Sequence, residues 1–380
     1  MSAGSALQAH PIRNFLVAGC TVVGNCVLLD ELKNRAPAQC EHVTAGRLRG
    51  FYHRGLRLGD PCTVTARVPC PSKNWQGAAV ASDTKRMREI EIDRGDRVLR
   101  VRDAGDPDGP VVIYFHGTPG SRLDLGFGEH VAGEQGVRLV TFDRPGYGGS
   151  TAAPFGLASI AADAHAVADG LGVARFATLG MSGGGPGSLA AATVPGDRVI
   201  RAGVASGAAP FQLVPGALDH LDDNDQAAMK HLPADPAAAA ARFAAGFEPL
   251  IGAVAPGGQG PAVAFADLLS PRDSELMKDP RLVSALTATM REGLRAGTSG
   301  GGWDNVSWLG TWDVDLSAIR CPVLLWYGTH DRFAPLPLGR WLAENLPDAR
   351  LVIRKGEGHF GIMEHLGEML DALTDPDPAS

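Results

Sequence analysis

The stretch FATLGMSGGGPGSLA at residues 176–190 decides the fold. Its apolar start at 176–179 is typical of a buried strand, and the residues from 186 to 194 predict a helix. Between them stands a Gly-x-Ser-x-Gly motif centred on Ser182. In this context the serine takes a strained backbone conformation, and the glycines let strand and helix approach. The turn holds the hydroxyl at a helix N-terminus, which favours developing negative charge. A chance glycine-rich turn is the alternative for this motif alone.

Further strands and helices alternate on both sides of this motif. Strands alternating with helices imply an α/β fold with a mainly parallel sheet covered on both faces. With the strand at 176–179, we expect strands at 88–92, 98–101, 111–115, 137–142, 199–205, 323–327 and 351–353, and helices at 158–171 and 338–346. The first two strands read as a hairpin.

One interval is too long for a loop. About 110 residues separate the strand ending at 205 from the next one, and a structureless loop of that length is improbable. Strong helix formers occur at 237–245, and a second helical pattern covers 281–294. We therefore expect a helical cap at 208–318, inserted between core segments 87–207 and 319–380.

The strand at 111–115 is followed by HGTPG at residues 116–120. Acyl transfer creates an oxyanion that needs two backbone N–H donors. In this topology one comes from the residue after the nucleophile, Gly183, and the other from the loop after the earlier strand. Thr118 is the candidate for the second donor, since Pro119 has no N–H. A simple Gly-Pro turn is the alternative.

A serine nucleophile needs a base, and the base needs an acid that orients it. The expected chain order is serine, acid, histidine. Asp331 ends GTHD at 328–331, and His359 stands in GEGHF at 356–360, each just after a strand. The other strand end that could supply the acid reads SGAA at 206–209 and has no carboxylate. We predict a triad of Ser182, Asp331 and His359. Three competing histidines are read as surface, helical or loop-supporting residues: His330, His365 and His116.

Together these motifs and DRPGYGGS at 143–150 make residues 87–380 resemble the α/β-hydrolase fold, in its capped hydrolase-1 type. The resemblance implies an eight-stranded, mostly parallel sheet with a helical cap after the sixth strand. It also implies a Ser182–Asp331–His359 triad and a reaction without metal or organic cofactor. The expected function is hydrolysis of a carboxylic ester of a small, apolar substrate through an acyl-enzyme.

The resemblance excludes some relatives and leaves others open. Epoxide hydrolases and haloalkane dehalogenases place Asp where Ser182 stands. Proline iminopeptidases share the His-Gly-x-Pro-Gly loop and hold a free amine with cap carboxylates. Asp222, Asp223 and Asp225 could do the same, or could form a solvated helix end. A cofactor-free perhydrolase and a ligand receptor on a hydrolase scaffold also remain. Three cap tryptophans could form an apolar wall or simply pack: Trp303, Trp308 and Trp312.

Residues 1–86 differ from the rest of the chain. They carry an excess of basic residues and five of the six cysteines, whereas the whole chain has a net charge of −7. They contain no Cys-x-x-Cys pair of the kind that binds zinc. Their apolar run at 15–29 is shorter than the ~20 residues that a membrane-spanning helix needs. We expect a disordered leader, or translated upstream sequence with the true start at Met87. The acidic balance argues against nucleic acid as a partner. We expect a cytoplasmic protein with a small-molecule substrate, no membrane partner and an undetermined oligomeric state.

Overall fold

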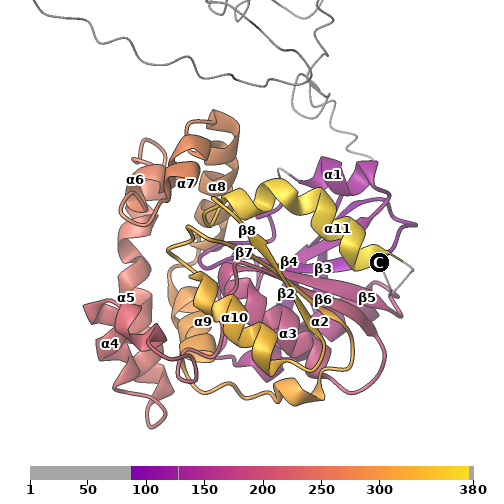
Figure 1. The fold of residues 1–380 in the computed structure, drawn as a ribbon, viewed down its shortest axis with the longest axis horizontal. Helices are drawn as coiled ribbons and strands as arrows, with labels where there is room; N and C mark the ends of the chain where they lie inside the picture. Colours follow the sequence, from indigo (N-terminus) through magenta and orange to yellow (C-terminus); the bar gives the residue numbers. More distant parts are fainter. Residues whose placement is uncertain (1–86, 127, 376–380) are drawn as a thin grey trace, which may run out of the picture. The chain divides into compact units, whose positions relative to one another are not determined.

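The computed structural model describes residues 87–126 and 128–375. The expectations for residues 1–86 lie outside the described residues. The described chain forms one eight-stranded sheet in the order β1-β2-β4-β3-β5-β6-β7-β8 (Figure 1). The strands are β1 (Arg88–Asp93), β2 (Val98–Gly105), β3 (Val111–Phe115), β4 (Arg138–Phe142), β5 (Phe176–Met181), β6 (Val199–Ala205), β7 (Val323–Gly328) and β8 (Ala349–Arg354).

The sheet is mostly parallel, as predicted. The β1–β2 hairpin is antiparallel, and β2 runs antiparallel to β4. The remaining neighbours pair in parallel, from β4 through β3, β5, β6 and β7 to β8. The central strands β3 and β5 are buried along their whole length, which is the burial expected of parallel strands covered on both faces.

Alternating residues of β3 show how the two faces are covered. Val112 and Tyr114 pack with α1 and α11, whereas Ile113 and Phe115 pack with α2 and α3. Figure 1 shows these two helical layers on opposite sides of the sheet. The layers consist of α1 (Glu129–Glu134) and α11 (Leu366–Thr374) on one face, and α2 (Leu157–Gly170), α3 (Gly185–Thr193) and α10 (Leu336–Asn345) on the other. Short 3-10 helices are η4 (Ser182–Gly184), η5 (Ala217–His220), η6 (Leu316–Ala318) and η7 (Gly361–His365).

The strand β2 is longer than its apolar pattern predicts. The predicted strand ends at residue 101, whereas β2 continues to Gly105. In the structure Asp103 is buried and is paired with two arginines. Arg138 donates two hydrogen bonds of 3.0 Å to its carboxylate, and Arg88 also binds it. These pairs compensate the buried charge, so the strand continues along β4.

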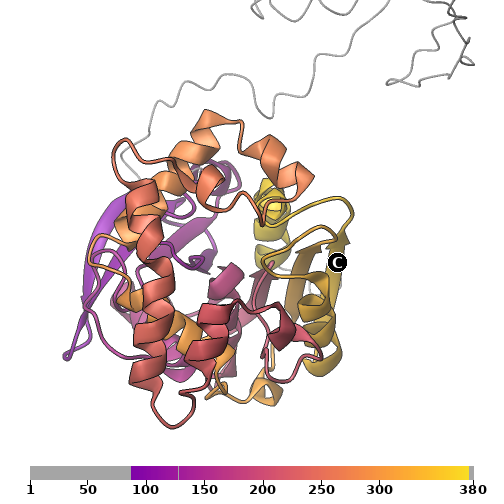
Figure 2. The same ribbon diagram turned by 90° about the vertical axis from the view of Figure 1, so that its left-hand side faces the viewer.

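Six α-helices lie between β6 and β7 in the described chain, and we call them the cap. Figure 1 shows α4 to α7 to the left of the sheet, and Figure 2, which looks onto that side, shows them in front of it. The cap comprises α4 (Asp223–Met229), α5 (Pro236–Val254), α6 (Pro261–Ala264), α7 (Pro271–Leu276), α8 (Pro280–Gly293) and α9 (Ser299–Leu309). The two predicted cap helices correspond to α5 and α8.

The long helix α5 packs closely on α9. A Cβ atom on Gly302 would lie only 2.2 Å from the carbonyl oxygen of Ala240, so the glycine permits this approach. Phe243 of α5 is buried. Among the described helices, α5 alone is long and apolar enough to cross a membrane, a property that core helices share.

Candidate active site

The Gly-x-Ser-x-Gly motif forms the predicted tight turn between β5 and α3. Ser182 has φ 54°, a conformation that is strained for a residue with a side chain. A Cβ atom on Gly180 would lie 2.2 Å from the carbonyl oxygen of Gly184. A Cβ atom on Gly184 would lie 2.2 Å from the carbonyl oxygen of Phe115. Both glycines are therefore required for the turn that presents Ser182.

Asp331 and His359, which follow β7 and β8, meet in a buried pair. The Nδ1 atom of His359 lies 2.9 Å from Oδ2 and 3.1 Å from Oδ1 of Asp331. The N–H groups of Phe333 and Ala334 each donate a 2.9 Å hydrogen bond to Oδ1, which orients the carboxylate. Burial alone would lower the pKa of His359, but the carboxylate of Asp331 raises it above the ordinary histidine value.

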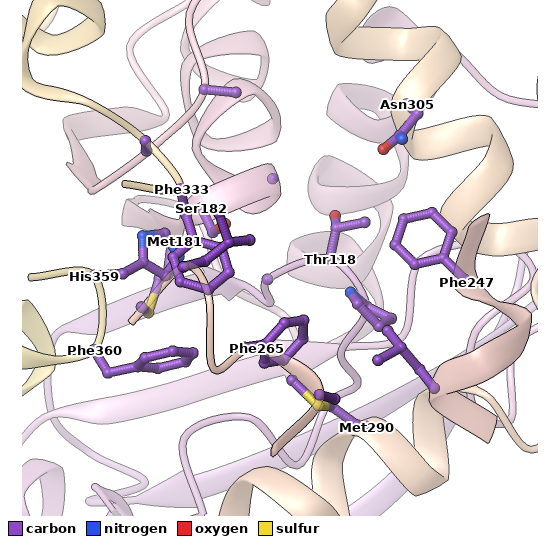
Figure 3. A pocket seen from close by; sticks show the side chains of 18 of the residues that line it. Thr118, Met181, Ser182, Phe247, Phe265, Met290, Asn305, Phe333, His359 and Phe360 are labelled. Carbon is purple, nitrogen blue, oxygen red and sulfur yellow. The ribbon is translucent and has the colours of Figure 1, made fainter. Parts of the chain in front are cut away.

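Ser182 and His359 line the same cavity, which has a volume of about 470 Å³. Figure 3 shows both side chains at one end of the cavity and those of Asn305 and Phe247 at the other. The hydroxyl of Ser182 forms no hydrogen bond with the described residues. The ring of Phe333 covers that of His359, with 4.7 Å between the ring centroids.

The two predicted oxyanion donors, Thr118 and Gly183, also line the cavity. Their segments touch: a Cβ atom on Gly183 would lie 2.2 Å from Oγ1 of Thr118. Neither backbone N–H donates to a described residue, so both are available to a ligand. Four of the five sequence-predicted site residues thus line one cavity, and the fifth, Asp331, contacts Nδ1 of His359 from outside the lining.

A buried ion pair holds the Thr118 loop, and sequence reasoning missed it. Asp304 of α9 accepts hydrogen bonds from Oγ1 of Thr118 at 2.7 Å, from Nε of Arg144 at 2.9 Å and from the Tyr147 hydroxyl at 2.6 Å. Arg144 also donates to the carbonyl oxygen of His116 at 2.6 Å. Arg144 and Asp304 are each 1% exposed. The cap therefore takes part directly in positioning the loop after β3.

His116 supports the loop as a neutral ring. Burial, followed by the charge of Arg144, lowers its pKa well below the ordinary histidine value. The backbone N–H of Arg144 donates to Nε2 of His116 at 3.3 Å. The Nδ1 atom of His116 lies 2.8 Å from the carbonyl oxygen of Gly117. This arrangement matches a tautomer protonated on Nδ1. It agrees with the loop-supporting role expected from sequence.

A second cap carboxylate, Asp273, holds the loop that carries His359. It accepts the N–H groups of His359 at 3.1 Å, Phe360 at 2.8 Å and Gly361 at 3.2 Å. Asp273 also forms a capping box with Ser270 at the start of α7. Ser-Pro-Arg-Asp at residues 270–273 contained the capping signal, but nothing local indicated its distant partner.

A third missed carboxylate, Asp124, lies in the cavity wall beside the Thr118 loop. It accepts a hydrogen bond from the hydroxyl of Tyr114 at 2.8 Å and from the N–H of Gly117 at 3.1 Å. Burial raises its pKa above the ordinary aspartate value. Asp124 therefore adds a polar group beside the proposed oxyanion donors.

The rest of the cavity wall is mainly apolar, with contributions from the core and from α5, α8 and α9. Of the three cap tryptophans, only Trp308 lines the cavity, whereas Trp303 and Trp312 pack against the buried core. Of the two alternatives, ordinary packing therefore holds for Trp303 and Trp312, and only Trp308 contributes to the wall. Large apolar lining side chains include Phe211, Phe243, Phe247, Leu250, Phe265, Leu286 and Met290.

Two of the three acidic residues considered for amine binding, Asp222 and Asp225, line the same cavity. Asp222 caps α4 by accepting the N–H of Asp225 at 2.8 Å. Burial and the neighbouring Asp222 raise the pKa of Asp225 to about 6. Among the described residues, no group of three or more His, Cys, Asp or Glu side chains could hold a metal ion.

Comparison with known proteins agrees with this architecture. A family model described as the alpha/beta hydrolase fold matches residues 110–366. Over 57 residues the chain is 40% identical to the pimeloyl-(acyl-carrier protein) methyl ester esterase of Chromobacterium violaceum, a match that covers 15% of this chain and 22% of that protein. The chain therefore matches about a fifth of the length of this curated relative.

Solved structures resemble the chain over most of its length. The enol-lactonase from Burkholderia xenovorans LB400 has a TM-score of 0.54 and 18% identity, with 75% of this chain and 99% of that chain covered. An esterase from Exiguobacterium antarcticum has a TM-score of 0.54 and 21% identity, with 76% and 99% covered. Such identities establish a shared fold. The family model matches more than half of the chain, so the chain belongs to the α/β hydrolase fold family.

Proposed function

We propose that the protein is a serine hydrolase that cleaves carboxylic esters through an acyl-enzyme. The observation that carries the proposal is the buried Asp331–His359 pair, which opens onto the same cavity as the strained Ser182. The missing Ser182–His359 hydrogen bond does not oppose this role. In unliganded enzymes such bonds are often long and tighten only when substrate binds.

The proposed reaction has two halves. His359 takes the proton of Ser182 while the serine oxygen attacks the ester carbonyl carbon, and the N–H groups of Thr118 and Gly183 bind the resulting oxyanion. Collapse expels the alcohol, which takes the proton from His359. A water molecule then loses a proton to His359 and attacks the acyl-enzyme, which releases the acid and returns the proton to Ser182. Asp331 holds the imidazole in the required tautomer throughout.

Labelling with a fluorophosphonate probe tests this assignment. Wild-type protein should label, and Ser182→Ala should not. Ser206→Ala is the matched control, because Ser206 is also a serine with positive φ at a strand end (φ 48°) but does not line the cavity. An unlabelled wild type, or equal labelling of Ser182→Ala, would count against the proposal.

An aminopeptidase of the proline iminopeptidase kind is the second candidate. It is favoured by Asp222 and Asp225, which place carboxylates in the cavity wall where a substrate's free amine could bind. Assays with p-nitrophenyl esters beside proline and alanine anilides separate the two. Anilide hydrolysis without ester hydrolysis, lost in Asp225→Asn, would replace the esterase assignment.

The proposed chemistry uses only protein groups and water. Ester hydrolysis should therefore persist after dialysis against EDTA, and a loss restored by added metal would contradict this mechanism. We also propose a cytoplasmic location and a small-molecule substrate without nucleic-acid or membrane partners. Cell fractionation with an antibody against the chain tests the location.

A further inference from the structure

The carboxylate of Asp124 belongs to the wall of the cavity that holds Ser182 and His359. Asp124 is partly exposed although burial raises its pKa, which fits a side chain whose accessible surface faces the cavity. The Tyr114 hydroxyl and the N–H of Gly117 both donate to its Oδ2 atom. Donors directed at a carboxylate favour its charged form. Asp124 is therefore an anion in the cavity wall.

Asp124 lacks the cationic partner that other carboxylates inside this protein have. Those carboxylates pair with arginines: Asp103 with Arg138, Asp143 with Arg122, Asp163 with Arg97, and Asp304 with Arg144. The charge of Arg144 acts on Asp124, but its guanidinium binds Asp304, and Asp124 forms no ion pair with a described residue. Buried charges in proteins are generally paired, so the unpaired carboxylate is a candidate binding group for a cationic ligand.

Open space lies between Asp124 and the proposed nucleophile. A Cβ atom on Gly117 would lie 3.7 Å from Cβ of Ser182 and 4.0 Å from Oδ2 of Asp124. Both distances are ordinary van der Waals separations, so the absent side chain of Gly117 leaves room for a small group between the two residues. The charge of Asp124 also contributes to the raised pKa of His359. A substrate group a few bonds from the scissile carbonyl could therefore reach this carboxylate.

The other charged groups of the cavity wall also favour a cation. Among the described residues, the lining contains Asp124, Asp222 and Asp225 but neither lysine nor arginine. A cavity that is lined by one sign of charge and has apolar walls concentrates ligands of the opposite sign. An anionic substrate would instead be repelled by these carboxylates.

Resting on the proposed esterase function, we propose that Asp124 binds an ammonium group on the acyl chain of the substrate, a few bonds from the scissile carbonyl. An ammonium supplies both the N–H donors and the positive charge that this carboxylate lacks. A hydroxyl supplies a donor without charge, and a plain alkyl chain supplies neither. The site belongs to the core and adjoins Ser182, unlike the cap carboxylates Asp222 and Asp225 that were considered for an aminopeptidase.

A set of methyl esters that differ only at the end of the acyl chain tests the subsite. Methyl butanoate is the neutral reference, and methyl 3-aminopropanoate carries an ammonium in place of its terminal methyl group. Methyl 3-hydroxypropanoate carries a hydroxyl there, and monomethyl succinate carries a carboxylate. Hydrolysis is followed by pH-stat at a pH at which the amine stays protonated. Each kcat/KM is divided by that of methyl butanoate in the same protein, so a change in His359 that affects all esters cancels.

Asp124→Asn is the principal variant, because its carboxamide oxygen can still accept from Tyr114 and Gly117 while the charge is lost. The ratio for methyl 3-aminopropanoate should fall by at least about tenfold, which is the effect of losing a hydrogen bond between charged groups. The ratio for monomethyl succinate should rise, and that for the hydroxy ester should change less than that for the amino ester.

Asp267→Asn is the matched control. Asp267 is exposed and lies outside the cavity lining, next to the lining residue Leu268. Solvent and salt screen its charge, so this variant should keep every ratio within about twofold of wild type. Asp225→Asn is a separate arm. If it lowers the amino-ester ratio and Asp124→Asn does not, the ammonium binds at the cap carboxylates and the proposed Asp124 subsite is wrong.

Fluorophosphonate labelling distinguishes failure of the subsite from failure of the esterase function. If the wild type labels and Asp124→Asn keeps the wild-type amino-ester ratio, the subsite is wrong and the esterase function stands. If the wild type neither labels nor hydrolyses any ester, the proposed function fails and the subsite with it. Should Asp124→Asn not fold, the wild type decides alone. It should prefer the amino ester to methyl butanoate after correction for their hydroxide-catalysed rates, and the opposite preference would overturn the subsite.

Discussion

At the scale of single residues, the charge of His359 decides when the site can work. Its pKa is raised by Asp331 despite burial. The carboxylate favours the imidazolium, so the neutral ring that accepts the serine proton becomes available only at higher pH. A typical histidine titrates near pH 6.5. The Asp331–His359 pair therefore sets the pH below which the proposed reaction slows.

We expect kcat/KM for a p-nitrophenyl ester to rise with pH, with a midpoint above about 6.5. Asp331→Asn should move this midpoint down, because burial then dominates the pKa of His359. The same change should lower kcat by about 10⁴-fold, because the imidazole loses the carboxylate that fixes its tautomer. A pH–rate profile of both proteins checks the prediction, and an unchanged midpoint in the variant would contradict it.

The buried pair of Arg144 and Asp304 supports both stability and the site. Asp304→Asn should lower the free energy of unfolding by about 3 kcal/mol, because the guanidinium would keep its burial but lose its counter-charge. It should also lower kcat more than it changes KM, since Asp304 holds the Thr118 loop. Urea unfolding and ester kinetics measure the two effects.

Asp169→Asn provides the matched control for that change. Asp169 pairs with Arg198, but its side chain is 68% exposed. Solvent weakens such a pair, so this variant should be close to wild type in both assays. If Asp304→Asn and Asp169→Asn had the same free energy of unfolding and the same kcat, burial of the Arg144–Asp304 pair would not contribute to stability or to activity.

At the scale of elements, a glycine of α9 allows that helix to pack closely against α5 within the cap. Gly302→Ala would place a Cβ atom 2.2 Å from the Ala240 carbonyl oxygen of α5. Neighbouring backbone would have to move, and we expect a loss of about 1–3 kcal/mol in the free energy of unfolding. Because α9 also carries Asp304 and Asn305, activity should fall with stability.

Gly252→Ala is the opposite case on α5. A Cβ atom there meets nothing within 4 Å, and alanine favours an α-helix over glycine by about 1 kcal/mol. This variant should be as stable as wild type or more stable. Thermal unfolding measures the stability of both alanine variants. If both were less stable than wild type, the close packing of α9 on α5 would not explain the effect of Gly302→Ala.

At the scale of the whole molecule, the core supplies the proposed reacting groups, and the cap helices supply a large part of the apolar cavity wall. Ser182 and His359 come from the core, and Phe247 and Met290 from cap helices. We therefore expect the cap to influence which substrates fit. Each buried methylene contributes about 0.8 kcal/mol, so kcat/KM should rise about fourfold per methylene until the cavity is filled.

Phe247→Ala should shift the preferred acyl chain to greater length, because it removes an aromatic ring from the cavity wall. Ile251→Ala, four residues further along α5, removes an apolar side chain that is 40% exposed and outside the lining. It should leave the preference unchanged. A series of p-nitrophenyl esters of graded length measures both variants, and an identical optimum in all three proteins would contradict a cap-defined cavity.

The sequence by itself determined the eight strands along the chain, the α/β class and the choice of the candidate triad. These features are local: apolar runs mark strands, and glycines mark the turn around Ser182. Asp331 and His359 each directly follow a strand, and parallel strands end at a common edge of the sheet. Local patterns were therefore sufficient to choose the residues, and their roles stay predictions for the experiments above.

Only the tertiary structure decided what surrounds those residues. Thr118 and Asp304 are 186 residues apart, and Asp273 and His359 are 86 apart. Such pairs leave no periodic or local pattern, since the intervening chain has to fold before they can meet. For the same reason the sequence could not decide which of the three cap tryptophans lines the cavity and which pack on the core. Burial and long-range hydrogen-bond partners depend on how the whole chain packs, so they cannot be read from the sequence.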